Sequence, residues 1–325
     1  MSYPFNIYLL ALFSAGMISA LSLPLWRRWC RETGLVDDPG QRKIHHTPIP
    51  LAGGLAVLTG LLAPVLGGLV ALRLGWFGLE HAGFALSHGF SKRGLQLVAI
   101  LVGAVGMVLL GWWDDKYELP PARKFAGQLL IAALVAAAGV RITLFISNVA
   151  FSYAVTILWM LTLINAFNFM DNMNGLCTGL GAICAWYFAV IAATDGQYLV
   201  TLIALLTCGA LAGFLPYNFP RASAFLGDAG SHLVGYLLAV LAILPHFYSV
   251  ENPRHLAVLT PLLVLAVPLG DLVWVVVIRR RLGQPFYVGD NNHLSHRLVR
   301  RGHSKTTAVL MIWLLAALLG LPAAL

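Results

Sequence analysis

Charged side chains are scarce in this sequence. Only 10% of its 325 residues are Asp, Glu, Lys or Arg, and 59% are apolar, whereas a soluble globular domain usually carries about 25% charged residues. So few charges cannot coat a water-facing surface of this size, which excludes a soluble enzyme and a disordered chain. The composition instead predicts an integral membrane protein.

Cysteines are also few, and their placement excludes a disulfide scaffold. None of the four belongs to a CxxC pair, and three lie in apolar runs, so we interpret them as small apolar residues and not as metal ligands. No internal repeat or low-complexity linker divides the chain. Residues 1–325 are therefore predicted to form a single multi-spanning membrane domain, whose first apolar run is a spanning helix and not a signal peptide, because no basic segment precedes it.

Long apolar runs are abundant. A helix needs about 20 apolar residues to cross a bilayer, and the sequence contains ten candidate runs, which predict an all-α membrane protein with about ten transmembrane helices. The short link at 195–197 predicts that the sixth and seventh form an antiparallel hairpin. The runs lie near 5–25, 51–72, 95–112, 123–140, 150–168, 176–194, 198–215, 229–246, 256–279 and 306–323.

The distribution of Lys and Arg predicts the orientation. Sixteen of the 21 basic side chains fall in the loops on one side of the ten predicted helices, and cytoplasmic loops carry such an excess. Both termini are then predicted to lie outside. The net charge of +8 is explained mainly by these loops, so no nucleic-acid partner is expected.

The acidic residues gather on the same side. Ten of the thirteen Asp and Glu residues lie on or near the predicted cytoplasmic face, although the positive-inside rule says little about acidic residues. Carboxylates beside cations are what a site for a metal-bound phosphate needs. Five motifs on this face are candidates for such a site.

The first motif is the pair Asp114–Asp115 at the end of the third predicted helix. Two adjacent carboxylates at a membrane boundary are costly unless they are paired, hydrated or bound to metal. On a helix they diverge by about 100°, so one is expected to face a metal or substrate while a cation holds the other. The alternative is a solvated helix end.

The second motif places polar residues at the end of the fifth predicted helix. Asn168, Asp171 and Asn174 recur at every third position, so neighbouring members share a face. Burying these amides and the carboxylate without partners is expensive. A polar ligand is therefore favoured over hydrogen bonding between helices.

The third motif, 225–231, opens the eighth predicted helix with the sequence Phe-Leu-Gly-Asp-Ala-Gly-Ser. Gly227 allows close approach of the backbone. Asp228 is predicted at the N-cap position, where it either satisfies helix N–H groups or binds Mg²⁺ while the helix N-terminus attracts phosphate.

The fourth motif is the basic loop 279–305, which holds seven Lys or Arg residues. His293, His296 and Arg297 follow Asp290 closely, and such side chains can grip a diphosphate. The alternatives are a lipid anchor and a zinc site, which is disfavoured because no Cys joins the His residues.

The fifth motif lies between the first two predicted helices. Arg42, Lys43 and His45 precede a Pro-rich stretch, and Gly53–Gly54 open the second helix at close backbone range. A lipid phosphate is a natural partner for these cations. Ordinary positive-inside anchoring is the alternative.

Taken together, the motifs resemble the polyprenyl-phosphate N-acetylhexosamine-1-phosphate transferases, over nearly the whole chain. The C-terminal loop is closer to the N-acetylglucosamine-type branch than to the peptidoglycan-precursor translocases, which usually carry three successive His residues there. The matching positions include Arg42 to His45, Gly53–Gly54, Asp114–Asp115, Lys124 with Gln128, Asn168 to Gly175, Asn218, Phe225 to Ser231 and His293 to Leu298.

The resemblance implies an enzyme of the bacterial inner (plasma) membrane with a cytoplasmic active site. It would transfer a sugar 1-phosphate, with N-acetylglucosamine 1-phosphate as the expected group, from a UDP-sugar to undecaprenyl phosphate and release UMP. This is the first membrane step of cell-envelope glycan synthesis. The resemblance also implies Mg²⁺ as the cofactor, with Mn²⁺ as an alternative, and allows a homodimer.

The resemblance assigns roles to individual residues. Mg²⁺ is expected on Asp228, with help from Asp171, and Asp114, Asp115 and Asp171 are the catalytic candidates; whether Asp114 or Asp115 is a base, a nucleophile or a positioning group stays open. The remaining candidates are expected to bind substrate. They are Arg42, Lys43, His45, Lys124, Asn168, Asn174, Asn218, Phe225, His293, His296 and Arg297.

Two positions depart from the family pattern. Asn174 stands where the family usually has a second Asp, and Ser295 replaces one His of the His-x-His-His pattern. These departures bear on the sugar more than on the reaction class.

Other classes of protein fit the sequence less well. A secondary transporter is the main alternative, and Asp271 inside the ninth predicted helix favours it. However, the other polar residues cluster at helix ends on one side, and no repeat is present. An intramembrane aspartyl protease and a CDP-alcohol phosphotransferase lack their characteristic Asp motifs.

Overall fold

The protein is almost entirely helical in the computed structural model, which describes residues 4–38, 47–74, 80–143, 148–245, 259–285 and 291–324. A two-stranded antiparallel ribbon is the exception, pairing Val36 with Pro50. The elements are α1 (Phe5–Thr33), β1 (Val36–Asp37), β2 (Ile49–Pro50), α2 (Gly53–Arg73), α3 (Glu80–Tyr117), α4 (Pro121–Ala137), α5 (Val149–Met170), α6 (Leu176–Thr194), α7 (Tyr198–Asn218), α8 (Gly227–Leu241), α9 (Thr260–Val264), α10 (Ala266–Arg281), α11 (Leu294–Arg300) and α12 (Lys305–Ala324).

Seven of the described helices are long and apolar enough to cross a membrane, namely α1, α2, α3, α5, α6, α7 and α12. The chain is therefore a multi-pass, all-α membrane protein. Helices also occupy the other three predicted segments, but α4 and α8 are short and the ninth is divided into α9 and α10. Ten spans and their orientation remain predictions.

Helix α8 is the centre of the bundle. It packs against α3, α5, α2 and α6, and every residue from Ala229 to Leu241 is buried. A helix that is apolar on all sides is stable only when other helices enclose it. Asp228 is the single residue of α8 that is not fully buried, because it lies in the first turn, at the open end of the bundle.

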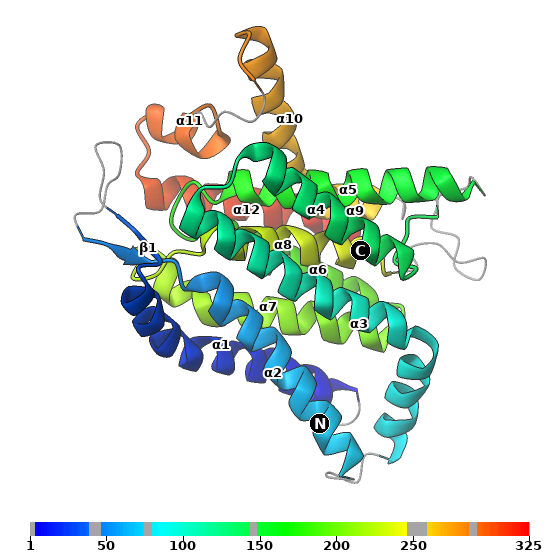
Figure 1. Ribbon diagram of the computed structural model, residues 1–325. Helices are drawn as coiled ribbons and strands as arrows, with labels where there is room; N and C mark the ends of the chain where they lie inside the picture. The colour runs from blue at the N-terminus through cyan, green and yellow to red at the C-terminus, as the bar shows by residue number, and fades with distance from the viewer. Residues whose placement is uncertain are drawn as a thin grey trace.

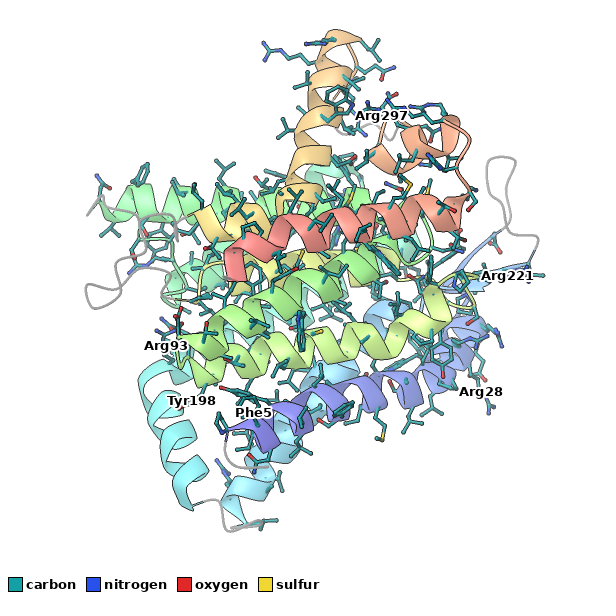
Figure 2. The ribbon with its side chains drawn as sticks, turned by 180° about the vertical axis from the view of Figure 1, so that it is seen from behind. Phe5, Arg28, Arg93, Tyr198, Arg221 and Arg297 are labelled. Carbon is teal, nitrogen blue, oxygen red and sulfur yellow. The ribbon has the colours of Figure 1, made fainter. Side chains whose placement is uncertain are left out.

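The segments that connect the helices lie at two opposite ends of the bundle, as the sequence predicts. Arg28 and Arg221 lie at one end, whereas Phe5, Arg93 and Tyr198 lie at the other (Figure 2). Both chain ends lie toward the second of these ends (Figure 1). The α6–α7 hairpin is confirmed, and Gly196 provides its left-handed residue, with φ of 65°.

Three helix boundaries differ from the sequence prediction. The ninth predicted helix is interrupted at Leu265, and α10 then runs away from the bundle with α11 beside it (Figure 1). Helix α8 begins at Gly227, so placing Asp228 at its N-cap was wrong, and Leu226 holds that position. Helix α3 extends beyond its apolar run to Tyr117 and therefore carries Asp114 and Asp115 within its last turns.

Candidate active site

The first turn of α8 is held by backbone contacts from elements distant in sequence. The N–H groups of Gly53 and Gly54 donate to the carbonyl oxygens of Phe225 and Leu226 at 2.9 and 3.1 Å. A Cβ atom on Gly54 would collide with the α8 backbone at Ala229 and Gly230. The close backbone range expected for these glycines is confirmed, and it fixes where α8 begins.

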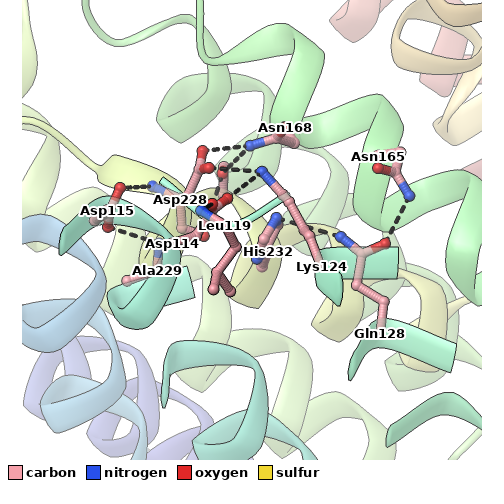
Figure 3. Close-up of polar contacts among 11 residues, drawn as sticks. Asp114, Asp115, Leu119, Lys124, Gln128, Asn165, Asn168, Asp228, Ala229 and His232 are labelled. Atoms are coloured by element: carbon pink, nitrogen blue, oxygen red, sulfur yellow. Dashed lines mark hydrogen bonds and ion pairs between the residues drawn. The ribbon is translucent and has the colours of Figure 1, made fainter. Parts of the chain in front are cut away.

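Asp115 caps α8 from another helix. Its Oδ1 accepts a hydrogen bond from the N–H of Asp228 at 2.7 Å, and its Oδ2 accepts one from the N–H of Ala229 at 3.1 Å (Figure 3). The first N–H groups of a helix have no partner within the helix, and a carboxylate there is also favoured by the helix dipole. Asp115 thus replaces the cap that Leu226 cannot supply.

Asp114 points in a different direction, as the helical geometry predicts. Its Oδ2 lies 2.6 Å from Lys124 Nζ, and its Oδ1 accepts from the N–H of Leu119 at 2.9 Å. The same Lys124 nitrogen lies 2.6 Å from Oδ2 of Asp228. One ammonium group therefore bridges carboxylates from α3 and α8.

Asn168 completes the surroundings of Asp228. Its Nδ2 donates to Asp228 Oδ1 at 2.6 Å and to Ser231 Oγ at 3.0 Å. Each oxygen of the Asp228 carboxylate thus has its own partner, an amide on one side and an ammonium on the other (Figure 3). These contacts fix the carboxylate orientation while the side chain stays about a third exposed, at 33%.

His232 is not among the predicted site residues and lies next to this cluster. It is fully buried, and its Nε2 lies 3.3 Å from Nε2 of Gln128. Gln128 in turn accepts from Asn165 Nδ2 at 2.9 Å. The spacing could have revealed it, because His232 is four residues after Asp228 and Gln128 four after Lys124, so each pair shares one helix face.

Asp114, Asp228 and His232 could hold a metal ion, because one ligand atom from each lies within 4.8 Å of the others. Carboxylate oxygens are the ligands that Mg²⁺ prefers. The predicted second metal ligand, Asp171, is not in this group of described residues. It stands instead on the wall of the neighbouring cavity.

A cavity of about 670 Å³ opens beside the cluster. Residues from separate motifs line it. One of these residues, Gly227, directly precedes Asp228, so the cavity wall extends to the cluster. Five of the predicted site residues line it, together with the cations Arg221 and Lys305. These five are Asp171, Asn174, Asn218, Phe225 and His296.

Asp171 follows the last residue of α5 and is the most perturbed carboxyl group of this cavity. Desolvation, followed by the charge of Asp228, raises the pKa of Asp171 to about 8. The carboxyl group is therefore largely protonated at neutral pH unless a metal ion lies beside it. A bound cation would favour its ionised form.

Asn218 and Phe225 both line the cavity, and three hydrogen bonds hold the side chain of Asn218. Asn218 is buried, and its Oδ1 accepts from the N–H of Gly175 and from Thr178 Oγ1, both at 2.9 Å. Its Nδ2 donates to the carbonyl oxygen of Ala224 at 3.1 Å. Asn218 thus connects the α5–α6 turn to the segment before α8, and at most one N–H is left for a ligand.

The three predicted residues in and directly before α11 take separate positions. His296 lines the cavity, His293 is buried against α10, and the Arg297 guanidinium stacks 4.4 Å from the ring centre of Trp274. Desolvation, followed by the neighbouring groups of His293, Arg300 and Lys305, lowers the pKa of His296. Arg42, Lys43, His45 and Asp290 lie outside the described residues.

Known proteins resemble this chain along almost its full length. A probable undecaprenyl-phosphate N-acetylglucosaminyl 1-phosphate transferase of Bacillus subtilis is 30% identical over 98% of this chain and 84% of its own. A decaprenyl-phosphate N-acetylglucosaminephosphotransferase of Mycobacterium tuberculosis is 32% identical over 96% and 80%. The undecaprenyl-phosphate alpha-N-acetylglucosaminyl 1-phosphate transferase of Escherichia coli is 26% identical over 95% and 81%.

The chain belongs to the polyprenyl-phosphate N-acetylhexosamine-1-phosphate transferase family. A model of glycosyl transferase family 4 matches residues 97–246. This stretch contains the whole cluster around Asp228, from Asp114 on α3 to His232 on α8, and ends before α10 and α11.

The two departures from this transferase family's pattern have structural explanations. Asn174 Nδ2 donates to the carbonyl oxygen of Pro220 at 3.2 Å, which an ionised carboxylate could not do. Ser295 is fully buried, and its Oγ donates to Asn172 Oδ1 at 2.6 Å. Ser295 therefore faces the α5–α6 turn and not the cavity.

Proposed function

We propose that this protein transfers N-acetylglucosamine 1-phosphate from UDP-N-acetylglucosamine to undecaprenyl phosphate and releases UMP. The reaction would take place at the cytoplasmic face of the bacterial inner membrane and begin the synthesis of a cell-envelope glycan. The names of the relatives from three bacteria support a polyprenyl-phosphate acceptor and the transfer of N-acetylglucosamine phosphate. The excess of Lys and Arg in the loops at the site's end of the bundle supports the cytoplasmic side.

One arrangement carries this proposal. A large cavity with polar and cationic side chains on its wall lies beside a cluster of two carboxylates and a lysine at the end of a transmembrane bundle. The cavity is large enough for a nucleotide sugar, since ligand pockets commonly measure about 300–1,000 Å³. The cluster lies where a lipid phosphate at the membrane surface could meet that donor.

The residues present fit a divalent cation with oxygen ligands. We propose that Asp228 and Asp114 hold Mg²⁺, or Mn²⁺ in its place, with Asp171 facing it from the cavity. Asp171 is also the group whose raised pKa would fall beside a cation. When bound, the ion would offset the negative charge of the diphosphate.

The side chains of this protein supply positioning and charge. An oxygen of the lipid phosphate attacks the sugar-bearing phosphorus of the donor, the bond from that phosphorus to the bridging oxygen breaks, and UMP leaves with this oxygen. The acceptor phosphate is already ionised at neutral pH, so no general base is required. Lys124 can turn toward a phosphate, while Asn168 and Asp115 keep Asp228 and the start of α8 in place.

The cavity wall is proposed to recognise the nucleotide. Phe225 offers a ring for stacking on uracil, and Asn218 offers its remaining N–H. His296, with Lys305 and Arg221 on the wall of the same cavity, would bind the diphosphate or the departing UMP. Asp114 shares Lys124 with Asp228, whereas both oxygens of Asp115 accept from the backbone of α8.

The transporter alternative receives no support. The residue that favoured it, Asp271, is bonded to His293 and to the backbone of Leu294. Its burial inside α10 is explained by these partners without an ion path.

The test is UMP release by the purified protein in detergent or nanodiscs. Undecaprenyl phosphate, Mg²⁺ and one UDP-sugar at a time would be supplied, with UDP-N-acetylglucosamine, UDP-N-acetylgalactosamine and UDP-glucose compared. We expect UMP and a lipid diphosphate product with the first donor. Absence of UMP with every donor would reject the proposed reaction.

Asp228→Asn and Asp195→Asn form a matched pair for this assay. Both remove one carboxylate charge, but Asp195 is exposed in the α6–α7 turn, at the other end of the bundle. We expect the first substitution to lower kcat by at least about a hundredfold and the second to leave it unchanged.

A further inference from the structure

Asp271 lies in α10 and is outside every motif assigned above. It is buried, with 5% of its surface exposed, and each oxygen of its carboxylate has a partner. Oδ2 lies 2.6 Å from Nδ1 of His293, and Oδ1 accepts from the backbone N–H of Leu294 at 2.6 Å. One carboxylate thus holds two consecutive residues of another segment.

The first of these contacts fixes the ring of His293. A carboxylate only accepts hydrogen bonds, so Nδ1 of His293 must carry the proton, and Nε2 remains as the second functional nitrogen. The ring also packs edge-on against Phe169 of α5, with ring centres 5.8 Å apart. His293 is itself 4% exposed, so neither its tautomer nor its orientation is left to solvent.

The second contact fixes the start of α11. Leu294 is the first residue of this helix. The preceding residue, His293, does not cap the helix with its side chain. The next residue, Ser295, is bound to Asn172 in the turn that follows α5. The short helix is therefore attached at its first turn to α10 by Asp271 and to the α5–α6 turn by Ser295.

This attachment determines where the cavity-lining part of α11 lies. His296 follows two residues after Leu294 and is on the wall of the cavity. A helix of seven residues is too short to be stable by itself, so its position depends on such tertiary contacts. A change at Asp271 would reach the cavity through His293 and the first turn of α11.

We propose that Asp271 is a positioning residue of the transferase site. It selects the tautomer and orientation of His293 and sets the first turn of α11, and so holds His296 against the donor. This inference rests on the proposed function for the identity of the donor. The geometry of the Asp271–His293 pair does not depend on it.

Two substitutions separate the two contacts. Asp271→Asn keeps an oxygen that can accept from the N–H of Leu294 but places an amide N–H against Nδ1 of His293, which forces the proton to Nε2. Asp271→Ala removes both contacts. Asp195→Asn is the control for loss of one carboxylate, and thermal unfolding verifies that each variant is folded.

We expect Asp271→Asn to lower kcat/KM for UDP-N-acetylglucosamine by about ten- to a hundredfold, mainly through KM, and Asp271→Ala to lower it further. Because Asp271 acts through His293, Asp271→Asn should have almost no additional effect in a His293→Ala background. Wild-type kcat/KM in Asp271→Asn, or effects that multiply in the double variant, would overturn the inference.

A spectroscopic measurement tests the pair without activity. In protein labelled with ¹⁵N-histidine, the Nδ1 and Nε2 chemical shifts of one residue, absent in His293→Ala, should exchange their protonated and unprotonated positions in Asp271→Asn. Unchanged shifts would refute the tautomer assignment. If the wild-type protein released no UMP but the shifts exchanged, the proposed donor chemistry would fail while the pairing held.

Discussion

The carboxylate of Asp115 accepts a 2.7 Å hydrogen bond from the backbone N–H of Asp228. The two residues are 113 positions apart in sequence. The contact attaches the end of α3 to the beginning of α8. It therefore fixes the backbone position from which the Asp228 side chain extends. Two adjacent aspartates thus have different tasks, since Asp114 faces Lys124 while Asp115 supports the backbone.

The first prediction concerns Asp115. In Asp115→Asn, one oxygen becomes an NH₂ group that faces an N–H of α8, so a charge-assisted hydrogen bond is replaced by a repulsive contact. We expect a loss of about 1.5–3 kcal/mol of stability and a lower kcat, measured by thermal unfolding and UMP release. Asp195→Asn is the control. Loss of activity at an unchanged unfolding temperature would instead indicate a direct chemical role for Asp115.

The second prediction concerns the bridging cation. Lys124 Nζ is 2.6 Å from oxygens of both Asp114 and Asp228, so it competes with a metal ion for the same carboxylates. Lys124→Met should tighten Mn²⁺ binding by about tenfold, or 1.4 kcal/mol, although UMP release falls. Electron paramagnetic resonance of free Mn²⁺ measures this affinity directly.

Lys116→Met is the matched control for that measurement. Lys116 lies in the last turn of α3, near the ring of Trp112 and the carbonyl oxygen of Thr33, and bridges no carboxylates among the described residues. Its loss should leave Mn²⁺ affinity within about twofold, because exposed charges are screened by water and salt. Equal tightening in both variants would mean that net charge, and not the bridge, controls metal binding.

The third prediction concerns pH. The pKa of His296 is lowered, so its ring is neutral at pH 7 in the donor-free protein. A diphosphate beside it favours the charged ring and raises that pKa, so donor binding takes up a proton. KM for the donor should therefore fall as pH decreases from 8 to 6, and His296→Gln should weaken this dependence.

His303→Gln serves as the control for His296, because His303 is exposed and outside the cavity lining. It should keep the wild-type pH dependence of KM. The same KM profile in His296→Gln and wild type would exclude proton uptake at His296.

The fourth prediction concerns Ser295, which departs from the family pattern. Ser295→His would restore that pattern but place an imidazole in a fully buried position, and overpacking typically costs about 1–3 kcal/mol. We expect lower stability and a higher donor KM. Ser295→Ala removes only the hydrogen bond to Asn172 and should cost about 1 kcal/mol. A fully active Ser295→His would show that α11 can adjust its position.

Much of this site is predictable because its signals are local. Apolar runs reveal the helices, and a spacing of four residues places Lys124 and Gln128 on one helix face. The same reasoning was wrong for Asp171, which lies beyond the end of α5 and on the cavity wall. The divergence of Asp114 and Asp115 follows from the helical rotation of about 100° per residue. His232 has the same spacing, since it follows Asp228 by four residues. Because the helix around it is apolar, however, its sequence does not indicate which face belongs to the polar site.

Pairings between helices could not be predicted in this way. The partner of a buried carboxylate depends on the rotation and depth of each helix, which small residues such as Gly54 and Gly111 set by allowing the α8 backbone to approach. Asp271 illustrates the difference. Its position inside an apolar helix suggests an ion path, yet the interruption at Leu265 and the return of α11 place it against His293.

The sequence alone thus determined the membrane location, the helical class, the family and the set of polar residues at one end of the bundle. These depend on composition and on spacing along one helix, and both can be read from a single chain. Only the tertiary structure decided that Asp115 caps α8, that Lys124 bridges two carboxylates and that Asp271 positions His293. Most of these contacts join residues 22 to 113 positions apart in sequence, and only the packing of the helices brings them together.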